Sequence, residues 1–118
     1  MKKTIEIADK EITFKANANT TRLYRKIFNQ DIFKDIKKLT PQAENGEIDA
    51  EGLEVFQNLA YVMAKQGGND MPDDIEEWLD QFEMFDIYMI MPQLVELWGT
   101  NELQLEVPKK KVEQQSDN

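Results

Sequence analysis

The acidic stretch NGEIDAEG, residues 45–52, has the composition of a calcium-binding loop. Such a loop needs a glycine at its sixth position and carboxylates at positions one, three and twelve. If Gly46 is the sixth residue, the positions that must supply carboxylates fall on Pro41, Ala43 and Gly52. None of these three side chains has an oxygen atom, so we do not expect the stretch to bind calcium.

Other groups that could do chemistry are scarce. The chain has no Cys and no His, and its only Ser is Ser116. These absences exclude disulfides, thiolate metal sites, the usual zinc sites and a serine nucleophile activated by histidine. A dense set of carboxylates could bind a divalent ion, but its spacing is typical of the solvated face of a helix. This set contains Asp73, Asp74, Glu76, Glu77, Asp80 and Glu83. We therefore expect no enzyme, no cofactor and no metal.

Charge is divided unevenly along the chain. Residues 1–38 hold ten Lys or Arg and five acids, a net charge of +5, whereas residues 39–118 carry a net charge of −14. An acidic surface repels the phosphates of nucleic acids. Arg22, Arg25 and Lys26 could contact nucleic acid, but we interpret them as a solvated helix face. The sequence shows no leader and no apolar run of about 20 residues. We therefore predict a cytoplasmic protein with neither a nucleic-acid nor a membrane partner.

The patterning predicts an α+β fold, predominantly α, in one domain that covers residues 1–99. Isoleucines and a phenylalanine alternate on either side of a turn, which predicts a β-hairpin over residues 3–15. A lone hairpin is marginal in water, so its apolar face must pack on helices. Residues 100–118 are polar and lysine-rich, and we expect them to form a flexible tail.

Five helices follow in the prediction, and their approximate bounds are residues 20–29, 31–39, 50–66, 73–83 and 85–98. We expect Pro41 to break the second helix, and Asp49 to cap the third. The third should end at Gly67 in the left-handed conformation. Pro72 is predicted to start the fourth helix.

The last predicted helix has more apolar residues than one buried face requires. An inward stripe is already complete, with Ile87, Ile90, Met91, Leu94, Leu97 and Trp98. A second set, which contains Phe85, Tyr88, Met89 and Val95, is then left on other sides. Either this helix is central and buried all round, or the second set binds a partner, for which methionine is well suited. Pro92 should kink the helix near Tyr88 or begin a new one.

Several segments together resemble the tail assembly chaperones of long-tailed phages (siphoviruses) that infect Gram-positive bacteria. The resemblance runs from about Lys3 to Lys111 and rests on the order and the amino-acid sequences of the segments. These are IEIADKEITFKA, TRLYRKIFNQDI, LEVFQNLAYVMAKQ, PDDIEEWLDQFEMFDIYMIMPQLVELW and PKKK.

The resemblance implies a non-enzymatic role in viral tail assembly. Proteins of this family bind the tape measure protein in the host cytoplasm, help recruit tail tube protein subunits around it, and are absent from the mature virion. Many also occur as a longer product of a programmed frameshift. Lys109, Lys110 and Lys111 either mark such a frameshift site or form a solubilising basic tail. The chain could also self-associate in this role.

The alternative function is a small acidic regulator that mimics nucleic acid and inhibits a host protein. The dense acids of residues 70–86 motivate it, whereas the apolar surplus at Phe85, Tyr88, Met89 and Val95 does not.

Overall fold

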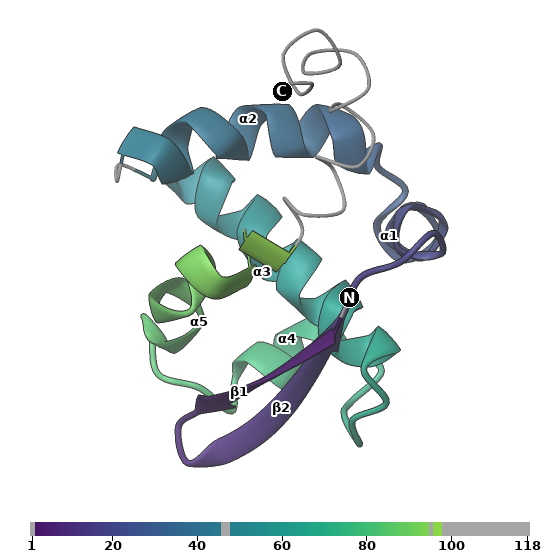
Figure 1. The fold of residues 1–118 in the computed structure, drawn as a ribbon, viewed down its shortest axis with the longest axis vertical. Coiled ribbons are helices and arrows are strands. Elements are labelled where there is room, and N and C mark those ends of the chain that lie inside the picture. The colour runs from purple at the N-terminus through teal and green to yellow at the C-terminus, as the bar shows by residue number, and fades with distance from the viewer. Residues whose placement is uncertain (1, 46–47, 95, 98–118) are drawn as a thin grey trace, which may run out of the picture.

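The computed structural model describes residues 2–45, 48–94 and 96–97 of the chain (Figure 1). The predicted tail, residues 100–118, lies outside them, as do Val95 and Trp98. The predicted α+β class is confirmed, with an N-terminal hairpin followed by helices. The elements in chain order are β1 (Lys2–Ile7), β2 (Lys10–Lys15), α1 (Thr20–Phe28), α2 (Ile32–Asn45), α3 (Ala50–Gln66), α4 (Ile75–Leu79) and α5 (Asp86–Met89).

The hairpin forms where its alternation predicts it. The two strands are antiparallel, and Ile5 is paired with Ile12. Ala8 and Asp9 form the two-residue turn, and both have positive φ, +51° and +67°. This is the backbone twist that suits a tight hairpin. Strand β2 packs against α3. The buried apolar side chains on one face of the hairpin are Ile5, Ile7, Ile12 and Phe14.

Helix α3 is the centre of the molecule. Figure 1 shows it running through the middle, with the hairpin at one end and the other helices around it. The hairpin strand β2 and the helices α1, α2, α4 and α5 all pack against α3. Every residue from Leu59 to Ala64 is almost completely buried, so α3 is enclosed on all sides over this stretch. Asp49 caps it as predicted, because its Oδ1 accepts a hydrogen bond from Gly52 N at 2.8 Å.

Helix α2 corrects the predicted break at Pro41. It begins at Ile32 and continues through Pro41 to Asn45, so the expected loop at residues 40–49 is mostly helix. A proline removes one backbone donor, but packing can hold a helix together around it. Here Ile32, Ile36 and Leu39 are buried and α2 packs on α3, which stabilises the turns that precede the proline.

The predicted helices 73–83 and 85–98 are shorter and more broken than expected. Helix α4 begins at Ile75 and ends at Leu79, and of its residues only Trp78 is fully buried. Because most of the stability of a helix in a protein comes from packing, a helix with one fully buried side chain is expected to be short. Helix α5 ends at Met89, and the chain is helical again at residues 91–94 and 96–97. Backbone N atoms of Gln93 and Leu94 both bond to Ile90 O, so a new helical segment starts around Pro92.

The end of α3 is held against the hairpin by Asn69. Its side-chain amide bonds to both backbone groups of Thr13 on β2: Oδ1 accepts from Thr13 N at 3.0 Å, and Nδ2 donates to Thr13 O at 2.7 Å. The same Nδ2 donates to Ala64 O in α3, also at 2.7 Å. One side chain therefore occupies the place of a further strand and ties β2 to the helix.

Residue 67 must be glycine because β2 passes close to it. The predicted left-handed conformation at Gly67 is wrong. Its φ is −72°, and the left-handed residue is Gly68, with φ +84°. A Cβ atom on Gly67 would lie 1.8 Å from Thr13 O, so only glycine allows β2 to approach.

We predict that Gly67→Ala destabilises the protein by about 3 kcal/mol, because the strand and the helix end must move apart. Gly68→Ala is the matched control: it meets no atom and should cost only about 1 kcal/mol, for the positive φ. Urea unfolding followed by circular dichroism measures both. Equal losses of stability would contradict the close approach of Gly67 and Thr13.

A buried hydrogen bond joins α1 to α2. Tyr24 is fully buried, and its hydroxyl donates to Oδ2 of Asp35 at 2.8 Å; Asp35 is itself buried. Burial, and then the hydrogen bond to the Asp35 carboxylate, raise the pKa of the Tyr24 phenol above its ordinary value. The pair fixes how the two helices meet.

We predict that Tyr24→Phe lowers the free energy of unfolding by about 2 kcal/mol, because it deprives a buried carboxylate of a donor. The double variant Tyr24→Phe/Asp35→Leu removes both partners and should recover part of this loss. Chemical denaturation of the three proteins measures the difference. A double variant that is no more stable than Tyr24→Phe would contradict this account.

Candidate partner-binding surface

Residues 83–86 form a closed turn between α4 and α5. The backbone N of Asp86 donates to Glu83 O at 3.1 Å, and Oδ2 of Asp86 accepts from Glu83 N at 2.9 Å. Two hydrogen bonds in opposite directions thus join the first and last residues of the turn. Its two central residues, Met84 and Phe85, are held at the tip.

The tip is apolar and exposed. Met84 is 78% exposed and Phe85 60%, and Met89, one helical turn after Phe85, is 70% exposed. Large apolar side chains that gather on a surface mark interaction sites more often than isolated ones do. We call Met84, Phe85 and Met89 the apolar tip.

The structure divides the four residues predicted to bind a partner. Phe85 and Met89 are exposed and belong to the apolar tip. Tyr88 is half-buried against the core, and its ring lies 6.4 Å from that of Phe85 in an edge-on arrangement, so it supports the tip from below. Val95 lies outside the described residues.

Met84 also belongs to the tip, although it is not among the four residues predicted to bind a partner. It lies directly before the predicted helix of residues 85–98. The signal was nevertheless present, because Met84 stands directly before Phe85 and between Glu83 and Asp86.

The choice between a central helix and an interface is also clearer. The central position belongs to α3, and the segment from Asp86 onward packs on α3 from one side only. The predicted inward residues Ile87, Ile90 and Met91 are buried, whereas Phe85 and Met89 are not. Phe85 and Met89, two of the four surplus apolar residues, are therefore on the surface of this chain.

Carboxylates surround the tip in sequence. Asp80 and Glu83 precede it and are exposed, and Asp86 lies between Phe85 and Met89. All six carboxylates of the predicted solvated face are exposed, and Asp73 pairs with Lys65 at 3.5 Å. Lys10 comes from the hairpin turn toward this region: its Nζ donates to Gln81 Oε1 at 2.7 Å and lies 5.9 Å from the Phe82 ring centre.

Metal ligands are not grouped here. Among the residues that the structure describes, no three His, Cys, Asp or Glu side chains are placed to hold a metal ion.

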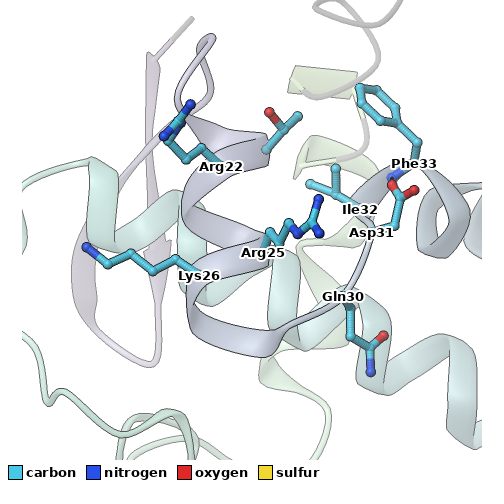
Figure 2. Close-up of a pocket in the computed structure, with 8 residues that line it drawn as sticks. Arg22, Arg25, Lys26, Gln30, Asp31, Ile32 and Phe33 are labelled. Carbon is cyan, nitrogen blue, oxygen red and sulfur yellow. Dashed lines mark hydrogen bonds between the residues drawn. The ribbon is translucent and has the colours of Figure 1, made fainter.

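A second surface feature lies between α1 and the start of α2. It is a hollow of about 820 Å³, which we call the basic hollow. Its exposed lining residues are Arg22, Arg25, Lys26, Gln30, Asp31 and Phe33. Figure 2 shows Arg25 reaching from α1 toward Asp31 and Ile32, whereas Arg22 and Lys26 point away from them. Within the described part of the chain, none of these three cations forms an ion pair.

Phe33 gives the basic hollow an apolar rim. In the sequence, Phe33 stands beside Ile32 and three residues before Ile36, and all three fall in the predicted helix of residues 31–39. The structure buries Ile32 and Ile36, but Phe33 is 42% exposed. Adjacent residues on a helix point about 100° apart, and Phe33 is turned by this angle from the buried side chain of Ile32. The Oδ1 of Asp31, meanwhile, accepts from Phe33 N at 2.9 Å and so caps the start of α2.

The apolar tip and the basic hollow lie on different sides of the molecule. Helices α1 and α5 both pack on α3, and Figure 1 shows them on opposite sides of it. The two surfaces carry opposite charge, and both present exposed apolar side chains.

No helix among the described residues is both long enough and apolar enough to cross a membrane. No protein-family model matches the chain, and no curated protein and no solved structure matches it either.

Proposed function

We propose that this chain is a non-enzymatic tail assembly chaperone of a phage, which binds apolar helical segments of a tape measure protein in the host cytoplasm. It would help recruit tail tube subunits and would be absent from the finished virion. The segment-by-segment resemblance supplies the identity of the client. The observation that supports binding is the apolar tip, which has three large exposed side chains. The closed turn at residues 83–86 holds Met84 and Phe85, and Met89 lies on α5.

The chemistry of the tip suits a long and varied client. Two of its three residues are methionines, whose flexible and polarisable side chains adapt to different apolar surfaces. Phe85 adds a rigid ring, supported by Tyr88. A tip of this kind can bind many similar stretches of a helical rod without reading one exact sequence.

The acidic surroundings suit the same role. Several chains bound along one rod would each add a net charge of −9, and their mutual repulsion keeps the complexes dispersed. The apolar surface of the client is meanwhile covered by the tips.

Phe85→Asp and Met89→Asp are each predicted to weaken binding of a tape measure fragment by about thirtyfold, because a charge must then enter an apolar contact. Their stability should change by less than about 0.5 kcal/mol, since both side chains are exposed. Co-expression and recovery of the soluble complex, followed by calorimetry, measures the loss.

Ala18→Asp is the control for this experiment. It adds the same charge at an exposed position before α1, and it should bind the fragment like the unchanged chain. Binding that survives both tip substitutions would overturn the proposal. Unfolding of both variants would show that the two side chains belong to the core.

Asp86→Ala is predicted to weaken binding of the tape measure fragment indirectly, by changing the turn that presents the tip. The substitution removes the acceptor for Glu83 N and loosens the turn that presents Met84 and Phe85. We expect a loss of affinity of about fivefold, equivalent to roughly 1 kcal/mol. Glu83→Gln is the matched control, because it removes a neighbouring charge while the backbone bonds of the turn remain. Calorimetry with the same fragment compares them, and equal losses would show that charge, rather than turn geometry, is responsible.

A further inference from the structure

The two exposed surfaces of this chain are complementary to each other. The apolar tip carries Met84, Phe85 and Met89 among carboxylates, and no Lys or Arg occurs between residues 66 and 97. The basic hollow carries three cations without an ion-pair partner in the described residues, one carboxylate, Asp31, and the exposed ring of Phe33, so its charge is net positive. An acidic and apolar surface therefore has a basic and apolar counterpart on the same chain.

The counterpart cannot be reached within one molecule. Helix α3 lies between α1 and α5, and both of them pack against it (Figure 1). One copy therefore presents the tip on one side and the hollow on the other. Contact between them requires a second copy.

The geometry points to head-to-tail association, in which the apolar tip of one copy docks into the basic hollow of the next. The exposed side chains of the tip would lie against Phe33 and the apolar stems of Arg25 and Arg22, and the carboxylates around the tip would face the guanidinium groups. A contact between two different surfaces leaves one of each free at the ends, so it produces chains or rings rather than a closed pair.

Self-docking would regulate the proposed client site. The tip is the surface assigned above to the tape measure protein, so this consequence, unlike the docking itself, rests on the proposed function. Copies without a client would cover one another's tips, and a client would displace the neighbouring copy. Association should weaken with salt, because it depends partly on exposed charges.

Sedimentation velocity on the full chain tests the docking, at about 50 mM and about 500 mM NaCl. The unchanged chain should form species larger than a monomer at low salt and dissociate at high salt. Arg22→Glu/Arg25→Glu, which alters the hollow, and Phe85→Ser/Met89→Ser, which alters the tip, should each associate at least about tenfold more weakly. Lys34→Glu/Lys37→Glu is the matched control: it changes the charge equally at exposed sites of α2 outside the hollow and should still associate.

Mixing the hollow variant with the tip variant gives the decisive result. One has an intact tip and the other an intact hollow, so together they should form dimers that do not grow further. A hollow variant that associates like the unchanged chain would show that the hollow is not the docking site, and the proposal would be wrong. A mixture that stays monomeric, or an unchanged chain that is monomeric at both salt concentrations, would also overturn it and leave the hollow to a different acidic partner.

The same variants separate this inference from the proposed function. The hollow variant keeps its tip and should still bind the tape measure fragment. If neither it nor the unchanged chain binds the fragment while the mixed variants form dimers, the proposed client is wrong and the docking is right.

Discussion

The enclosure of α3 is the constraint on which the rest of the structure depends. A helix buried on all sides from Leu59 to Ala64 needs other elements around it, because exposure of its large apolar side chains to water is unfavourable. The hairpin strand β2 covers one part of it, and α1, α2, α4 and α5 cover the others. A row of edge-on or tilted rings extends this core outward from α1 through α3 to α4, and its members are Tyr24, Phe28, Tyr61, Trp78 and Phe82.

This constraint also explains the exposed tip. The elements that precede residue 80 already cover much of the surface of α3. The segment after α4 packs on the part that remains, through Ile87, Ile90 and Met91. The chain reaches this position through the tight turn at residues 83–86, which directs Met84 and Phe85 away from the core. Their exposure is thus the result of a specific, hydrogen-bonded turn. A loose loop would not hold apolar side chains in one place for a partner.

The sequence predicted what depends on local patterning. Alternation located the hairpin, helical periodicity located α1 and α3, and Asp49 was recognised as a cap because its role involves only residues three positions away. It did not predict what depends on distant contacts. Gly67 is a glycine because of Thr13, fifty-four residues earlier, and Pro41 lies inside α2 because packing on α3 stabilises the helix before it. Phe85 and Met89 were identified as surplus by counting one helix face, but Met84 and Phe33 required the actual turns of the chain. The identity of the client rests on the resemblance alone.

Methionine oxidation tests the central claim most directly, namely that the apolar tip is open in the free monomer and covered by a partner polypeptide in the complex. Met84 and Met89 are exposed, whereas Met63 and Met91 are buried, so the chain contains its own reference residues. With dilute peroxide and peptide mass spectrometry, the free monomer should oxidise Met84 and Met89 at least about tenfold faster than Met63 and Met91. Adding a tape measure fragment should slow oxidation at the first two and leave the others unchanged. Equal rates at all four positions in the free monomer, or no protection of Met84 and Met89 in the complex, would contradict the account.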